Sequence, residues 1–171
     1  YWALFAGAHG HTYGCNPVWQ MWDRGRQPMI YARRPWHAAM HLPGSGQMQH
    51  VKALLLSRPF LSRIPDQSLI ASEVGEGTQH IQATRDSAGS YALVYIPSGA
   101  IFGPREIELD LTNLAGEQVV AWWYDPRTGA SRRVGAMPKQ ARMAFTVPYG
   151  GPDWVLVLDD AAAGYGRPGQ A

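Results

Sequence analysis

Residues 118–134 read Gln118-Val-Val-Ala-Trp-Trp-Tyr124, Asp125-Pro-Arg-Thr-Gly129 and Ala130-Ser-Arg-Arg-Val134, and this stretch decides the fold. Two strand-like runs flank a short segment of turn-forming residues, which is the pattern of a β-hairpin. We expect Asp125 to bond turn amides, Pro126 to fix its own φ and Gly129 to take the left-handed conformation. A carbohydrate- or protein-binding surface made by the neighbouring aromatic residues is the alternative interpretation.

The two-residue period of this hairpin extends along the chain in both directions, from about residue 70 to residue 158. Turn residues such as Pro97-Ser98-Gly99 separate the apolar runs. Short strands at nearly even spacing favour an antiparallel β-sandwich of about seven strands. The expected strands are His80–Arg85, Tyr91–Ile96, Ile107–Leu111, Gln118–Tyr124, Ala130–Val134, Arg142–Val147 and Trp154–Leu158.

Helical and loop patterns precede residue 66. Asn16 is expected to cap a short helix with Pro17 at its first position, and Pro43 is expected to open a helix that runs to about Ser57. The buried face of the second helix is predicted to hold Met48, Val51, Leu54 and Leu55. We therefore predict a mainly β protein.

The chain divides into three regions on this evidence. Residues 1–66 form a helical and loop region, residues 67–160 form the sandwich, and residues 161–171 form a flexible tail rich in Ala, Gly and Pro.

Composition argues against several classes of partner. The 15 Lys and Arg residues exceed the 13 Asp and Glu residues by too little to indicate binding to nucleic acid or to an anionic membrane. No apolar run reaches the roughly 18 residues that a membrane span needs. Cys15 is the single cysteine, so an intrachain disulfide is excluded and the cellular compartment stays open.

A histidine segment, Gly7-Ala-His-Gly-His-Thr-Tyr-Gly14, is the candidate functional site. In extended backbone the side chains of His9, His11 and Tyr13 point to one side. This arrangement predicts substrate-binding residues at the end of a strand. A structural turn whose histidines bond backbone groups is the alternative.

The sequence assigns no catalytic residue and no cofactor. A glycosidase needs two carboxylates across the bond to be cut, and residues 1–66 hold only Asp23 and Asp66, both in loop or turn patterns. His37 and His41 lack the glutamate of a metalloprotease helix, so no metal site is expected. A Gly-x-Ser-x-Gly serine nucleophile motif does not occur.

Taken together, these segments resemble the apiosidase-like glycoside hydrolases. Those of the first region are Gly7–Gly14, Val18-Trp19, Leu42-Pro43-Gly44, Gln47-Met48, His50, Ser57-Arg58-Pro59 and Pro65-Asp66. Those of the second region, which resemble the β-sandwich that follows the catalytic barrel, are Ala83–Asp86, Gly89–Ala92, Val94–Pro97, Ala121–Gly129 and Trp154–Leu158. That sandwich is often labelled a collagen-binding domain of a collagenase.

The resemblance implies a (β/α)₈ barrel that hydrolyses complex plant-type polysaccharides, of which residues 1–66 are a helical and loop remnant. It places the histidine segment at the rim of the last barrel strand. It also implies that the catalytic carboxylates come from earlier strands, so we expect a truncated and inactive fragment. Family habit points to a secreted or periplasmic protein.

Two other roles for the sandwich stay open. It is a binding module for polysaccharide or collagen if Trp122 or Trp123 belongs to an exposed row, although no residue pattern supports collagen binding. It is a structural brace if one face is apolar and turned toward the barrel region.

Overall fold

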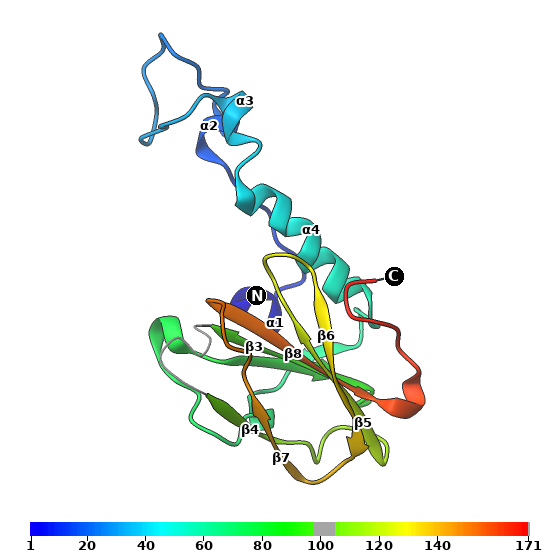
Figure 1. Ribbon diagram of the computed structural model, residues 1–171. Coiled ribbons are helices and arrows are strands. Elements are labelled where there is room, and N and C mark those ends of the chain that lie inside the picture. Colours follow the sequence, from blue (N-terminus) through cyan, green and yellow to red (C-terminus); the bar gives the residue numbers. More distant parts are fainter. Residues whose placement is uncertain (98–104, 171) are drawn as a thin grey trace.

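A computed structural model describes residues 1–97 and 105–170 of the chain, and Figure 1 shows a β-sandwich that carries a helical arm. The α-helices are α1 (Trp2–Phe5), α2 (Asn16–Trp19), α3 (Trp36–Ala39) and α4 (Pro43–Leu56). The strands are β1 (Arg63–Pro65), β2 (Gln82–Asp86), β3 (Tyr91–Pro97), β4 (Glu106–Asp110), β5 (Gln118–Tyr124), β6 (Ser131–Pro138), β7 (Arg142–Thr146) and β8 (Asp153–Asp160). Three 3₁₀ helices are η1 (Gln67–Leu69), η2 (Gly77–Gln79) and η3 (Ala161–Ala163).

The strands form two antiparallel sheets, which confirms the predicted fold class. The larger sheet has the order β1-β2-β3-β8-β5-β6, and β4 pairs with β7 in the smaller sheet. The seven predicted strands correspond to β2 through β8 with ends shifted by a few residues. β1 was not predicted, because Ile64-Pro65 has the pattern of a turn; Pro65 is tolerated because β1 lies at an edge of the sheet.

The central strands are buried on both faces. Successive residues of β3, β5 and β8 alternate between two apolar clusters, because side chains of a strand point alternately to opposite faces. One cluster lies between the sheets and includes Trp123. The other lies between the large sheet and the helices; its buried members are Leu4, Phe5, Leu54, Leu55, Tyr91, Leu93, Tyr124, Val155 and Val157.

The hairpin turn between β5 and β6 has the predicted chemistry. Asp125 Oδ1 accepts a hydrogen bond of 2.9 Å from the Arg127 amide, and Gly129 has φ +71°. The Arg127 guanidinium also binds both carboxylate oxygens of Asp125 at 2.8 Å. Gly129 also lies close to α4, since a Cβ at residue 129 would be 2.5 Å from Nδ1 of His50 in that helix. The turn interpretation is therefore confirmed.

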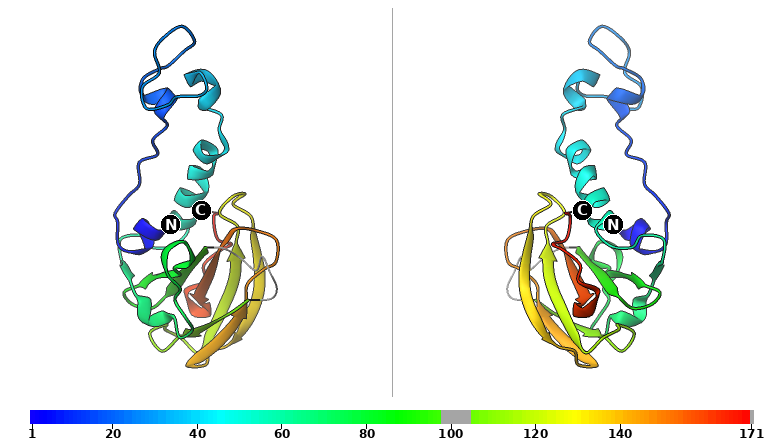
Figure 2. Two further views of the ribbon diagram at one scale, coloured as in Figure 1. Left: turned by 90° about the vertical axis from the view of Figure 1, so that its left-hand side faces the viewer. Right: turned by 90° about the vertical axis from the view of Figure 1, so that its right-hand side faces the viewer.

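The arm consists of α4 and the histidine segment, which run side by side to a distal element that holds α2 and α3 (Figure 2). The prediction for α4 is confirmed in its start and end, and Leu54 and Leu55 are buried as expected, whereas Met48 and Val51 are half-buried. The prediction that Asn16 caps α2 is wrong: α2 begins at Asn16 and has no side-chain cap. The Asn16 amide instead donates to the carbonyl oxygens of Met29 and Ile30.

The segment after β8 lies against the sandwich and the end of α4. The Gly166 carbonyl accepts from Arg58, and the Gly169 amide donates to Ser57 Oγ at 3.2 Å. Arg167 donates to the side chain and the carbonyl of Ser131. Fraying of this tail in solution stays a prediction. The predicted turn Pro97-Ser98-Gly99 lies outside the described residues beyond Pro97. Among the helices of the described ranges, none has both the length and the apolar character of a membrane span.

Candidate functional site

The start of the histidine segment is held by a glycine turn and one arginine. Gly7 has φ +109°, a conformation that L side chains rarely adopt, and it reverses the chain after α1. Arg63 of β1 then donates to the carbonyl oxygens of Leu4 and Ala8, the second at 3.1 Å. The segment from Ala8 to Cys15 is extended but pairs with no strand of the described ranges. Arg63 thus ties the start of the segment to the sheet.

The segment and α4 enclose a pocket of about 310 Å³. His9, His11 and Tyr13 all line it, as their alternation in extended backbone leads one to expect. All three side chains are exposed, and Tyr13 is 39% exposed. The opposite wall is mainly apolar; its residues are Leu4, Met48, Val51, Leu55, Leu56 and Phe60. The pocket thus combines hydrogen-bonding groups on one side with an apolar wall on the other.

Aromatic contacts link the pocket to the sheet. The His9 and Phe60 rings lie 5.7 Å apart, and the Arg63 guanidinium lies 5.3 Å from the Phe60 ring centre. Burial lowers the pKa of Arg63, and the nearby Tyr91 opposes this effect. Arg63 therefore orients both the backbone before His9 and the ring beside it.

Lys52 and Phe60 are among the pocket residues that the sequence reasoning missed. Lys52 is the single Lys or Arg side chain among the residues that line the pocket, and Phe60 contacts His9. Lys52 follows Met48 by four residues, so the helical period already placed it on the same side of α4. Phe60 follows the end of α4 and gave no comparable signal.

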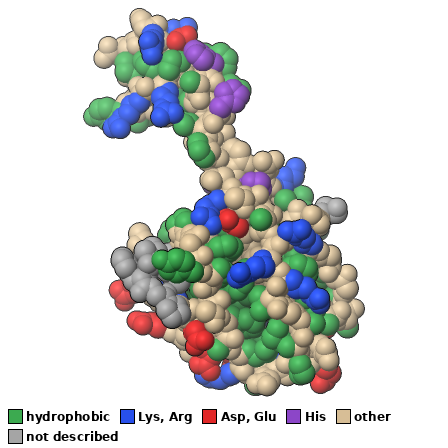
Figure 3. Space-filling model, in the orientation of Figure 1, with side chains coloured by type: hydrophobic (Ala, Val, Ile, Leu, Met, Phe, Trp, Pro, Cys, Tyr) green, Lys and Arg blue, Asp and Glu red, His purple; other side chains and the backbone are tan. Residues whose placement is uncertain are grey.

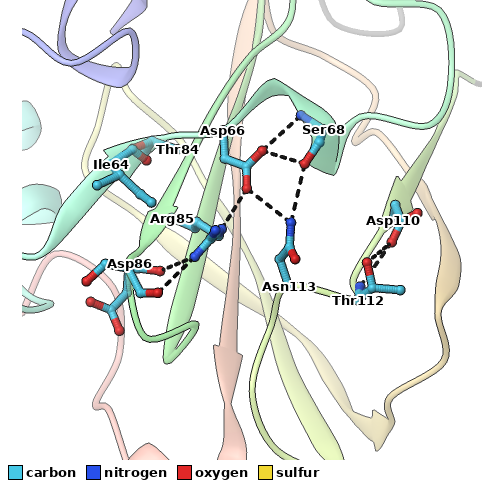
Figure 4. A network of polar contacts seen from close by, with 10 residues as sticks. Ile64, Asp66, Ser68, Thr84, Arg85, Asp86, Asp110, Thr112 and Asn113 are labelled. Atoms are coloured by element: carbon cyan, nitrogen blue, oxygen red, sulfur yellow. Dashed lines mark hydrogen bonds and ion pairs between the residues drawn. The ribbon is translucent and has the colours of Figure 1, made fainter.

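The acidic residues of the first region, Asp23 and Asp66, accept hydrogen bonds from neighbouring groups of the fold. Figure 4 shows Asp66 with Ser68, Arg85 and Asn113, and the Asp66–Arg85 distance is 2.6 Å. Burial alone would raise the pKa of Asp66, but its hydrogen bonds to Ser68 and Arg85 outweigh burial and hold that pKa below its usual range. Asp23 Oδ1 accepts from the Arg24 amide in the distal element. None of the residues that line the histidine pocket is acidic.

Asp153 and Asp159 are perturbed in the opposite direction, because burial raises the pKa of each. Burial raises the pKa of Asp153, although its hydrogen bond from Tyr95 and the nearby Arg127 lower it. The Tyr95 hydroxyl donates to Asp153 Oδ2 at 3.2 Å. Asp153 begins β8 and does not line the histidine pocket, so it gives that pocket no acid or base.

No metal-binding group was found in the part of the chain that the structure describes: no three His, Cys, Asp or Glu side chains are arranged to hold an ion. His37 and His41 are exposed on the distal element. Cys15 is half-buried, with its Sγ 3.9 Å from the Ala39 carbonyl oxygen.

The two neighbouring tryptophans do not form an exposed row. Trp123 is 2% exposed, and Trp122 is half-buried against the helix-side cluster with the Arg133 guanidinium 5.9 Å from its ring centre. The helix-side face of the large sheet is instead apolar and covered by α1 and α4. Hydrogen bonds cross this contact from Tyr124 to the His50 carbonyl and from Tyr91 to the Pro59 carbonyl, both at 2.8 Å.

Two protein-family models match the chain, and they meet between its two regions. Residues 1–62 match "Apiosidase-like, catalytic domain", and residues 64–159 match "Putative collagen-binding domain of a collagenase". No curated protein matches the chain.

Two solved structures are similar over nearly the whole chain. One is described as a glycoside hydrolase, with 35% identity and a TM-score of 0.86. The other is a glycoside hydrolase family 5 protein from Bacteroides vulgatus ATCC 8482, with 35% identity and a TM-score of 0.85. Each match covers 95% of this chain but only 35% of the other chain, so this sequence spans about a third of the length of these relatives.

Proposed function

This chain belongs to the glycoside hydrolases in which an apiosidase-like catalytic domain is followed by a β-sandwich, and we propose that it is the carboxyl-terminal portion of an enzyme that cleaves complex plant-type polysaccharides. The observation that carries the proposal is the pocket lined by His9, His11 and Tyr13, which offers hydrogen-bonding groups but no carboxylate. A sugar presents hydroxyl groups that imidazole and phenol side chains bind well.

The catalytic carboxylates are assigned to chain outside these 171 residues. Hydrolysis of a glycosidic bond needs an acid and a second carboxylate on opposite sides of that bond. The first 62 residues, which match the catalytic domain, contain one acidic residue, Asp23. In this proposal His9, His11 and Tyr13 bind and orient the sugar at the rim, and the pair that cleaves it faces them from other strands of the barrel.

The sandwich serves as a brace in this proposal. Its large sheet packs an apolar face on α1 and α4, and a buried ion pair joins Arg58, which follows α4, to Asp159 of β8. The apolar contact and the ion pair together hold α4, and hence one wall of the histidine pocket, in a fixed place. A polysaccharide- or collagen-binding role based on Trp122 and Trp123 has less support, because neither side chain is exposed.

The test compares this chain with a longer form that includes the upstream coding sequence. Both are assayed for release of reducing sugar from pectic polysaccharides. We expect activity in the long form alone, and activity in the 171-residue chain would disprove the assignment of the carboxylates. In the long form, Tyr13→Phe should lower kcat/KM about tenfold, the effect of losing one hydrogen bond to substrate.

Tyr149→Phe is the matched control, because Tyr149 is 78% exposed and does not line the pocket. It should leave kcat/KM unchanged. Equal effects of the two substitutions would remove Tyr13 from the proposed site.

A further inference from the structure

A second groove lies at the open edge of the sandwich, between β6 and β7. It has a volume of about 520 Å³. β6 is the outermost strand of the large sheet, and β7 pairs only with β4 among the described strands. The groove is lined by Trp123, Arg132, Arg133, Met137, Phe145 and Thr146, among others. Trp123 and Phe145 belong to the core between the sheets, so the groove reaches down to core side chains.

The charge of this groove is positive and not neutralised. Arg132 and Arg133 are exposed, and neither forms an ion pair with any residue in the described ranges. No acidic residue lines the groove. Figure 3 shows Lys and Arg side chains beside hydrophobic ones on the face of the sandwich that carries β6.

Three other arginines of the sandwich and its contact with α4 form ion pairs with aspartates, which Arg132 and Arg133 do not. Arg58, Arg85 and Arg127 each bind an aspartate within 2.8 Å. Arg132 stands opposite Trp123 in the β5–β6 register and makes no described contact of this kind. Arg133 stands opposite Trp122 and stacks on its ring, which leaves its N–H groups free of a described acceptor. Successive side chains of a strand point to opposite faces, so Arg132 shares the face of Trp123 and the groove floor, whereas Arg133 lies on the Trp122 side of β6. The Arg132 guanidinium is thus the group that the groove offers to a ligand.

We propose that this groove binds a polysaccharide that carries carboxylate groups, at a site separate from the histidine pocket. The proposal rests on the proposed function, because a glycoside hydrolase meets polysaccharide chains. Guanidinium groups bind carboxylates through two parallel hydrogen bonds. The Thr146 hydroxyl donates to Glu106 Oε1 at 3.4 Å and can still accept a hydrogen bond from a sugar hydroxyl. The apolar floor suits the C–H faces of sugar rings.

An acidic peptide fits this edge less well. Peptides bind strand edges mainly by adding a strand. The β5–β6 pairing is irregular between Ala121 and Trp122, which places a bulge in β6 near Val134. Bulges and charged side chains at an edge oppose the addition of a strand. These features favour a ligand that binds through side chains.

Affinity gel electrophoresis of the 171-residue chain tests the proposal, with polygalacturonate in the gel and neutral galactan as the reference polymer. We expect retardation by polygalacturonate alone, and a dissociation constant at least tenfold weaker for Arg132→Gln than for the unchanged protein. Arg132→Lys should recover only part of the binding, because lysine keeps the charge but lacks the two-pronged geometry. Circular dichroism verifies that the variants are folded.

Arg142→Gln is the matched control, since it removes the same charge from an exposed strand position that does not line the groove. It should bind like the unchanged protein. Equal binding by all variants, or equal retardation by galactan, would overturn the proposal and leave the arginines as protection of the β6 edge. Retardation by polyglutamate but not by polygalacturonate would overturn it in favour of an acidic peptide.

The hydrolysis assay on the longer form separates this proposal from the proposed function. Arginine-dependent binding without hydrolysis by the longer form would support the groove and count against the enzyme. Hydrolysis without such binding would overturn the groove alone.

Discussion

The guanidinium of Arg58 and the carboxylate of Asp159 form a two-pronged ion pair that joins the end of α4 to the end of β8. Nη2–Oδ2 is 2.6 Å and Nε–Oδ1 is 3.0 Å. The two side chains are 1% and 3% exposed. Nη2 of Arg58 also donates to the Gly166 carbonyl. One guanidinium thus connects three parts of the chain in a place that excludes water.

Removing either partner leaves a buried charge without compensation. We expect Arg58→Ala or Asp159→Ala to lower the free energy of unfolding by about 3–5 kcal/mol. Urea unfolding followed by circular dichroism measures the loss. Arg142→Ala is the control, because the exposed Arg142–Glu108 pair at 3.9 Å should contribute less than about 1 kcal/mol. Similar losses for the two arginines would show that burial of the pair has no special weight.

Gly129→Ala tests the contact between the hairpin turn and α4. A Cβ at residue 129 would lie 2.5 Å from His50 Nδ1, and φ is +71°. Gly164 has φ +65° with open space around it, so Gly164→Ala isolates the backbone strain of about 1–2 kcal/mol. We expect Gly129→Ala to be more destabilising in thermal unfolding, and His50→Ala to reduce the difference. Equal effects of the two glycine substitutions would contradict a close contact with His50.

Leu54 and Leu56 give a test of the brace. Leu54 is fully buried against the large sheet, whereas Leu56 is 53% exposed. Leu54→Ala should cost about 2–5 kcal/mol, and Leu56→Ala should have a small effect on the free energy of unfolding. In the longer form, Leu54→Ala should also weaken substrate binding if the sandwich holds the pocket wall in place. An unchanged KM in a folded Leu54→Ala enzyme would count against bracing of the site.

Acid should destabilise the protein through Asp66, Asp86 and Asp125. Burial raises the pKa of each, but hydrogen bonds to neighbouring residues outweigh it and hold each pKa below the usual 3.8. The unfolded chain then binds more protons than the folded one below about pH 4, so stability falls as pH drops through this range. Asp153 and Asp159 act in the opposite sense, because a raised pKa favours the folded state when the carboxyl is protonated.

Asp66→Asn isolates one of these contributions. We expect Asp66→Asn to lose about 1 kcal/mol at pH 7, because the variant lacks the ion pair with Arg85. The loss should shrink as pH falls through the lowered pKa of Asp66, because the carboxylate of the unchanged protein then becomes protonated. Urea unfolding at a series of pH values measures both. Glu73→Gln is the control, because it removes the same negative charge at an exposed position. Parallel pH curves for Asp66→Asn and the unchanged protein would show that Asp66 adds nothing to acid sensitivity.

Short-range sequence patterns predicted the turns and helices that are determined by interactions between residues close in sequence. The turn at Asp125 and Gly129 follows from the chemistry of those residues, and α4 follows from Pro43 and the helical period after it. The alternation of His9, His11 and Tyr13 placed these side chains on one pocket. Their contact with sugar stays a prediction.

Features that depend on distant residues were beyond local patterns. Arg58 and Asp159 are 101 residues apart, and no period relates them. Asn16 has the composition of a cap, but its amide satisfies carbonyls of a loop that local spacing does not bring near. Whether Arg132 and Arg133 are paired likewise depends on which acids the fold places beside β6.

The position of β8 has a consequence for synthesis. It follows the other strands of the large sheet in sequence, yet it lies between β3 and β5 in the middle. While the chain emerges from the ribosome, the β1-β2-β3 part and the β5-β6 part have no strand to join them, and their apolar faces stay uncovered until β8 arrives. Folding of the sandwich must therefore wait until β8 has left the exit tunnel, and the nascent chain is exposed to aggregation until then.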